Sequence, residues 1–113
     1  MVSVKLPPKL RIGPFDFDIV VWSNEKGTDV GKFGEFSVVD GTISLDVTRE
    51  HKTLDTLIHE ILHAIWWTGN LAEENVSEED AVSALSTGLL LMLRDNPEIL
   101  KIINQWAKRT RTL

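Results

Sequence analysis

The spacing of the hydrophobic residues changes near Thr53, and this change constrains the fold more than any other feature of the chain. Before it, alternating or β-branched runs extend over Phe15 to Trp22, Gly34 to Val39 and Thr42 to Val47. After it, apolar residues recur three and four positions apart, as in an amphipathic helix. Strands followed by helices predict an α+β fold, with three helices packed on a small antiparallel sheet of about three strands. With 113 residues, the chain is expected to form one domain over residues 1–113.

Two segments of the first half carry turn or loop signals. Asp40-Gly41 separates the last two strand runs, and Gly tolerates the positive φ of a two-residue hairpin turn. A β-hairpin is therefore predicted there. The segment Ser23 to Lys32 is rich in Gly, Asn and charged residues, which predicts a loop.

The second half carries start and stop signals for three helices. The first helix ends at Gly69, since Gly is a common residue just past a helix end. Ser77 is the expected N-cap of a second helix, which has an acidic first turn and continues through Leu93. Asn96-Pro97 starts the third helix.

Composition excludes several classes of protein. The formal net charge of −5 argues against a protein that grips phosphate backbones, so no nucleic-acid partner is expected. No apolar run has the length of a membrane span or the form of a signal peptide, which predicts a cytoplasmic protein without a membrane partner. The chain has no Cys, so any metal ion must be held by His and carboxylate groups.

The motif with the clearest chemistry is His-Glu-x-x-His at His59, Glu60 and His63. Two histidines four residues apart lie one turn apart on one face of a helix, so both imidazoles can reach a single ion. Glu60 projects to the side of that pair, where it can hold a water on the ion and act as its general base without itself coordinating. On a helical wheel both histidines lie nearly opposite the apolar stripe, so they do not belong to it, which favours metal binding over a structural role.

A zinc site of this kind needs a third protein ligand and an open position for water. The acidic run at the start of the second helix offers Glu78 and Glu79, and His51 is an alternative that would have to fold back from before the first helix. Glu79 is preferred over Glu78, because the small residues Ser83 and Ser86 follow it at helical spacing and permit close helix approach. A second interpretation is that these acids only favour the helix N-terminus.

The order of features resembles a known group of enzymes. The motif helix, followed by a helix that carries Glu78-Glu79, is similar to the gluzincin branch of the zincin metallopeptidases. A hairpin ending in Ile43 to Asp46, the segment Thr56 to Ala64, and Asp95 to Pro97 further resemble small phage-encoded metallopeptidases.

This resemblance implies a zinc cofactor, with His59 and His63 as ligands and Glu79 or Glu78 as the third ligand. It also implies Glu60 as the catalytic base, a peptide or protein substrate, and a phage or prophage protein that acts in the host cytoplasm. Other divalent ions also occupy sites made of His and carboxylate groups, so the sequence predicts the site more firmly than the metal.

The chain departs from the gluzincin pattern because it has no Tyr, the residue that commonly stabilises the reaction's oxyanion. His51 is the remaining histidine for that task. An alternative function is therefore a metal-stabilised binding or regulatory domain with little turnover. The sequence does not predict the oligomeric state.

Zincin substrates commonly lie as an added strand along a sheet edge beside the metal, by β-augmentation. The run Thr42 to Val47 directly precedes the motif helix and is either this edge or an ordinary strand within the sheet. Trp66 and Trp67 at the end of that helix either wall a substrate pocket or pack in the core.

Overall fold

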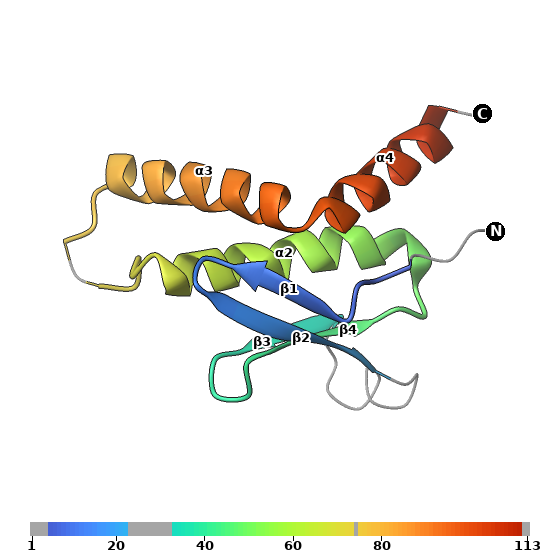
Figure 1. The fold of residues 1–113 in the computed structure, drawn as a ribbon, viewed down its shortest axis with the longest axis horizontal. Coiled ribbons are helices and arrows are strands. Elements are labelled where there is room, and N and C mark those ends of the chain that lie inside the picture. The colour runs from blue at the N-terminus through green and yellow to red at the C-terminus, as the bar shows by residue number, and fades with distance from the viewer. Residues whose placement is uncertain (1–4, 23–32, 74, 112–113) are drawn as a thin grey trace.

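The computed structural model describes residues 5–22, 33–73 and 75–111, and the α+β fold is confirmed (Figure 1). The loop predicted at Ser23 to Lys32 lies outside the described residues. The elements are β1 (Lys9–Ile12), β2 (Phe15–Trp22), β3 (Gly34–Ser37), β4 (Thr42–Asp46), α2 (Glu50–Thr68), α3 (Glu78–Asp95) and α4 (Pro97–Arg111).

The described strands form one four-stranded sheet in the order β1-β2-β4-β3. The outer pairs β1–β2 and β3–β4 are antiparallel, whereas β2 and β4 are parallel with Asp18 opposite Thr42. The prediction of a small, mainly antiparallel sheet holds, but the prediction of about three antiparallel strands differs from this sheet in two respects. It misses β1, which at four residues is too short to show a period, and it misses the parallel pair, which depends on where the chain returns to the sheet.

The hairpin between β3 and β4 is confirmed, but its loop is longer than the predicted two-residue turn. Residues 38–41 form the loop, and Gly41 has the positive φ of 66° expected of it. Ser37 Oγ accepts a hydrogen bond of 3.1 Å from the Asp40 backbone N–H, which closes the loop directly after β3.

The hairpin inserts β4 between β2 and β3, so β3 forms the sheet edge. Four of the five residues of β4 are buried, as in an inner strand. Of the two interpretations of the run Thr42 to Val47, the ordinary strand within the sheet is therefore confirmed and the edge strand is wrong.

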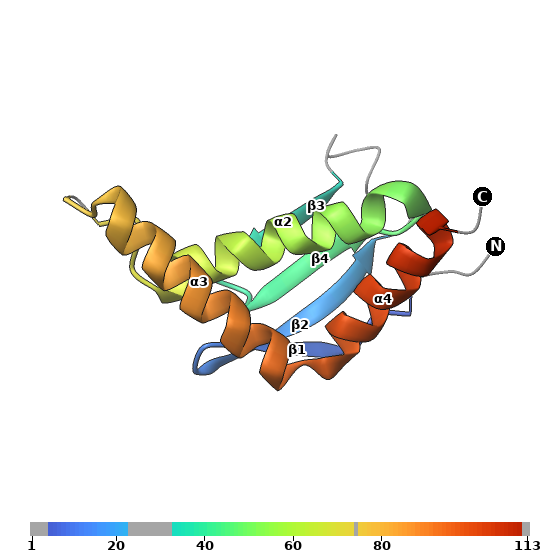
Figure 2. The same ribbon diagram turned by 90° about the horizontal axis from the view of Figure 1, so that it is seen from above.

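The three helices lie on one face of the sheet, with α2 next to the strands, α3 across α2 and β1, and α4 continuing from the end of α3 (Figures 1 and 2). Apolar side chains of the strands and helices meet between these layers in a single cluster. The fully buried members of the cluster are Leu10, Ile43, Leu45, Leu57, Ile61, Ala64, Met92 and Ile99. Within the described residues, no helix is both long and apolar enough to cross a membrane.

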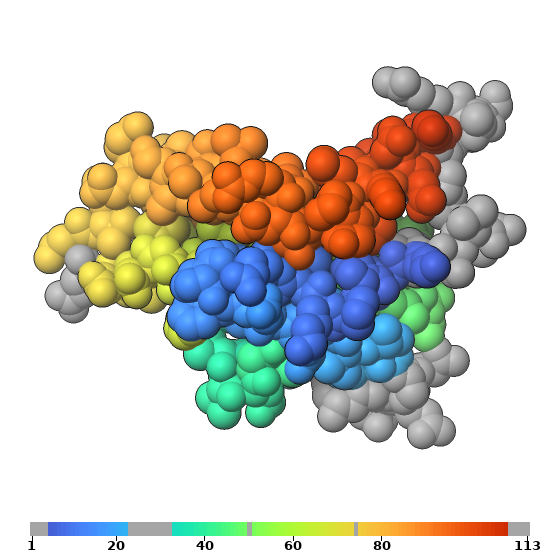
Figure 3. All heavy atoms as spheres, viewed as in Figure 1, coloured from blue at the N-terminus to red at the C-terminus, as the bar shows by residue number. Residues whose placement is uncertain are grey.

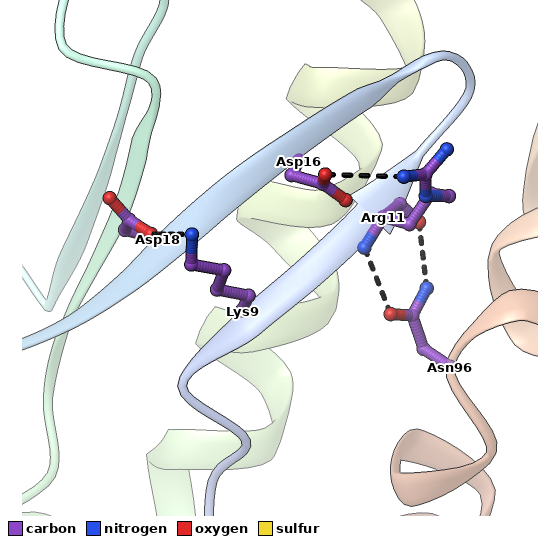
Figure 4. A network of polar contacts seen from close by, with 5 residues as sticks. All are labelled: Lys9, Arg11, Asp16, Asp18 and Asn96. Atoms are coloured by element: carbon purple, nitrogen blue, oxygen red, sulfur yellow. Dashed lines mark hydrogen bonds and ion pairs between the residues drawn. The ribbon is translucent and has the colours of Figure 1, made fainter.

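Asn96, at the corner between α3 and α4, ties the helices to β1 (Figure 4). Its Oδ1 accepts from the Arg11 backbone N–H at 2.9 Å, and its Nδ2 donates to the Arg11 backbone carbonyl at 2.7 Å. Nδ2 also donates to the Met92 carbonyl at 2.8 Å. The buried amide therefore pairs with β1 as a neighbouring strand would, and Figure 3 shows the side chains of α3 and α4 lying directly on those of β1. This contact closes the outer edge of the sheet at Arg11.

Asp46, the last residue of β4, shapes the connection into α2. Its Oδ1 accepts hydrogen bonds from the Thr48 hydroxyl at 2.5 Å and from the Thr48 backbone N–H at 2.9 Å. These two bonds, with a smaller contribution from the Arg49 charge, hold the pKa of the Asp46 carboxyl below its ordinary value. The connection is short, and α2 already begins at Glu50.

Replacement of Asn96 by Asp is expected to destabilise the fold by roughly 2–4 kcal/mol, since a carboxylate cannot donate to the two carbonyls and is left buried against them. Thermal unfolding followed by circular dichroism measures this loss. Asn104→Asp makes the same chemical change at an exposed position of α4 and should leave the melting temperature nearly unchanged. Equal melting temperatures of the two variants would contradict the role given to Asn96.

The lowered pKa of Asp46 predicts a pH-dependent contribution to stability. A carboxyl with a depressed folded-state pKa stabilises the fold above its unfolded pKa of about 3.9, and this stabilisation is lost as the pH falls through the lower, folded value. Asp46→Asn should therefore lower the melting temperature at pH 7, and the difference from the unchanged protein should shrink below about pH 4. Asp18→Asn, which removes an exposed ion pair, is the control. A pH-independent difference for Asp46→Asn would rule out this linkage.

Candidate metal site

The packing of α2 decides which of its side chains face outward. Leu57, Ile61 and Ala64 are fully buried against the sheet, while His59 and His63 are exposed on the opposite side. The prediction that both histidines lie away from the apolar stripe is confirmed. The sheet thus fixes the helix without using the two imidazoles.

The two imidazoles have a geometry that fits one metal ion. The Nε2 atoms of His59 and His63 are 3.2 Å apart, and the ring planes are inclined by 73°. Two nitrogens that each bind a tetrahedral zinc at about 2.0–2.1 Å lie about 3.3 Å from one another. The pair therefore already has the separation that shared zinc ligation needs.

Glu60 completes a compact group with the two histidines. Each of the three residues offers one ligand atom, and these atoms all lie within 4.8 Å of one another. Glu60 is only 6% exposed, in contrast to the exposed His59 and His63. At about 100° per residue, Glu60 points from the histidine face toward the side of α2 that packs on β3. The group can therefore bind a metal ion.

Two hollows flank the histidines, one on each side of α2. The first, of 250 Å³, lies between α2 and the start of β3, and its lining includes Phe33, Gly34, Thr56 and Glu60 together with His59. The second, of 380 Å³, lies on the side of α3 and is lined by His59, Leu62, His63, Trp66 and Leu85. His59 lines both hollows and so lies between them. The hollow beside β3 is polar, and the hollow beside α3 is apolar.

Glu78 and Glu79 do not belong to the compact group found among the described residues. Both are exposed in the first turn of α3, where the Ser77 hydroxyl caps the helix as predicted. Leu85 is the α3 residue beside the histidines, and six residues of helix span about 9 Å, so both acids lie well before it. Figures 1 and 2 show the start of α3 extending beyond the end of α2. Their assignment as third ligand stays a prediction, which requires a different placement of the start of α3.

His51 lies in the first turn of α2 and not before the helix as expected. Eight residues of helix, about 12 Å, separate it from His59, and it is not a member of the compact group. His51 therefore lies about two helical turns before His59, too far to share an ion with the other two histidines.

The close approach of α2 and α3 also differs from expectation. Gly88 allows it, since a Cβ there would lie 2.5 Å from Ile65 Cγ2. Ser83 and Ser86, which were expected at this contact, are exposed.

The structure adds residues from β3 that sequence patterns did not indicate. A Cβ on Gly34 would lie 2.6 Å from Thr56 Cγ2 and 2.8 Å from the Ser44 carbonyl oxygen, so β3 approaches α2 this closely because of glycine. Thr56 precedes Glu60 by four residues and could have been found by helical spacing. Gly34 gave no comparable signal, because its contact depends on the order of the strands.

The two tryptophans after the motif separate into different roles. Trp67 packs in an aromatic cluster with Phe15, Phe17 and Phe36, with ring centroids 5.2–6.4 Å apart. Trp66 instead lines the apolar hollow beside the histidines.

Comparisons of this chain with protein-family models, with curated proteins and with solved structures found no match. The geometry of the group therefore carries the functional argument.

Replacement of Gly34 by Ala is expected to destabilise the protein by roughly 1–3 kcal/mol, since the Ser44 carbonyl is backbone and cannot move aside easily. Chemical denaturation measures the change. A second substitution, Thr56→Ser, removes the methyl group of one of the two clashes and should restore part of the loss. Unchanged stability in Gly34→Ala would show that β3 does not lie this close to α2.

Proposed function

We propose that this protein is a zinc-dependent peptidase of the zincin type, in which His59 and His63 bind the ion and Glu60 is the general base. The observation that carries the proposal is the 3.2 Å separation of the two Nε2 atoms, with Glu60 in the same compact group. A helix by itself brings the two histidines of the motif to one face, but it does not decide whether that face is exposed. Its orientation, with the histidines exposed and Glu60 turned toward the β3 side, is what a hydrolytic site needs.

The chain's own residues have distinct tasks in this proposal. An ion held there would supply Lewis acidity, which brings the pKa of water to about 7 and polarises the scissile carbonyl. Glu60 accepts the proton of the attacking water and afterwards delivers it to the leaving amine. His59 and His63 project from a helix whose backbone is fixed by the packing of its other side on the sheet.

The substrate would enter along β3, by the main-chain recognition known as β-augmentation. In the β3–β4 ladder, the Phe33 carbonyl accepts from the Asp46 N–H, so hydrogen-bonded pairs alternate from that point. The backbone groups of Gly34 and Phe36 therefore face away from β4, toward the side where no described strand lies. At the other end of the sheet Asn96 already occupies the edge groups of Arg11, which favours β3 as the binding edge.

The second candidate function is a metal-stabilised binding domain with little turnover. The position of Glu78 and Glu79 at the start of α3 favours it, because Glu60 is then the carboxylate of the compact group and would serve as a ligand instead of as the base. The two functions differ in what Glu60 does, and a substitution there separates them.

Zinc content and turnover test the proposal together. The purified protein should hold one equivalent of zinc per chain by elemental analysis, and His59→Ala and His63→Ala should lose it. Glu60→Gln should keep the zinc but lower peptide hydrolysis by roughly 10²–10⁴-fold, the usual contribution of general base catalysis. Glu79→Gln and Glu78→Gln, made singly, should weaken zinc binding in whichever variant removes the third ligand.

His51→Ala is the matched control, since it removes the remaining histidine of the chain two turns away on the same helix. It should keep full zinc content. Stoichiometric zinc without hydrolysis of any peptide in a broad mixture would favour the binding domain. Absence of zinc after reconstitution would rule out both functions.

A further inference from the structure

The apolar hollow on the α3 side of the histidines has no task in the proposed chemistry. Leu62 and Trp66 form its α2 wall and remain 38% and 40% exposed, and Leu85 faces them from α3. Single exposed apolar residues are common on protein surfaces. Here two of them lie four residues apart on one helix face, with a third apolar residue opposite, and His59 and His63 complete the lining. The hollow is therefore continuous with the candidate metal site.

The hollow and Glu60 lie on opposite flanks of the histidines. At about 100° per residue, Glu60 is turned about 100° from His59 in one direction, and Leu62 about 60° in the other. A carbonyl held above the histidine pair, with Glu60 and its water on the β3 side, therefore has the α3 hollow on its other side. A side chain adjacent to the reacting bond has room there.

The chemistry of the lining selects the kind of side chain. Apart from the two imidazoles, its residues are Leu62, Trp66 and Leu85, which offer no partner for a charged group. Burial of a charge without a partner is costly, whereas burial of an aliphatic or aromatic group is favourable. The volume of 380 Å³ lies near the lower end of the roughly 300–1,000 Å³ of ligand pockets, which suits one large side chain.

We propose that Leu62, Trp66 and Leu85 form the specificity pocket of this site, and that it takes a large apolar side chain, of the leucine or phenylalanine class, next to the cleaved peptide bond. This inference rests on the proposed function. It assigns to Trp66 a substrate contact and leaves Trp67 in its aromatic cluster with Phe15, Phe17 and Phe36.

Leucine hydroxamate and glycine hydroxamate are suitable probes, because they carry the same metal-binding group and differ in the side chain. Isothermal titration of the zinc-loaded protein should show leucine hydroxamate binding about tenfold more tightly or better, as expected for burial of one aliphatic side chain. Leu62→Ala and Trp66→Ala should bring this ratio close to one without changing zinc content or the affinity for glycine hydroxamate. Leu90→Ala is the matched control, since Leu90 lies on α3, is 67% exposed and does not line the hollow.

The outcomes separate this inference from the proposed function. Absence of zinc and of binding by either hydroxamate would overturn the proposed function itself. Bound zinc with equal affinities for the two hydroxamates would overturn the specificity pocket alone. A loss of the preference in Leu90→Ala as large as in Leu62→Ala would also overturn it. A self-associated protein that dissociates on Leu62→Glu substitution, measured by light scattering, would show that a second copy covers the hollow and would likewise overturn it.

Discussion

The packing of one side of α2 against the sheet is the interaction on which the rest of the molecule depends. Leu57, Ile61 and Ala64 are withdrawn from water by β-strand side chains such as Ile43 and Leu45. At roughly 25 cal/mol per Å² of apolar surface, such burial is the main favourable contribution to folding. Because a helix is rigid, burial of this side also determines the direction of every other side chain on α2. The exposed histidines, the turned Glu60 and the two flanking hollows all follow from it.

The two edges of the described sheet differ, because a side chain pairs with the β1 edge, whereas the β3 edge lies beside the candidate site. At β1, the Asn96 amide replaces a neighbouring strand by pairing with both backbone groups of Arg11. Exposed strand edges can pair with other chains, so closing one of them removes an unwanted site of association. At β3, Gly34 brings the edge against Thr56 and so next to the helix face that carries Glu60. A strand that pairs with β3 would therefore pass beside the histidines.

The small size of the domain explains how the candidate site is built. Among the described residues, the candidate site lies between two hollows on either side of a single helix. The polar hollow contains Glu60 and borders the open edge, and the apolar hollow is completed by Leu85 of α3. Gly88 allows α3 to approach α2 closely at Ile65, which brings Leu85 into position. The crossing of α3 over α2 thus supplies one wall of the apolar hollow.

The sequence by itself determined the features that depend on neighbours along the chain. The motif at His59 to His63, the outward direction of both histidines, the Ser77 cap and the hairpin with Gly41 all rest on helical or turn geometry within a few residues. Local geometry is encoded by residue spacing and by the φ preferences of single residues, so it can be predicted without the fold. The same spacing could not place Glu79 or His51 relative to the histidines, because that depends on helix ends and helix crossings.

Only the tertiary structure decided the strand order, the parallel pairing of β2 with β4, and the choice of β3 as the edge. It also separated Trp66, which lines the apolar hollow, from its neighbour Trp67, whose ring packs against phenylalanines of the sheet. These features join segments far apart in the sequence, and which segments meet depends on the packing of the whole domain rather than on any local pattern. For this protein the sequence specified the chemical groups and their helix face, and the packing of sheet and helices decided what surrounds them.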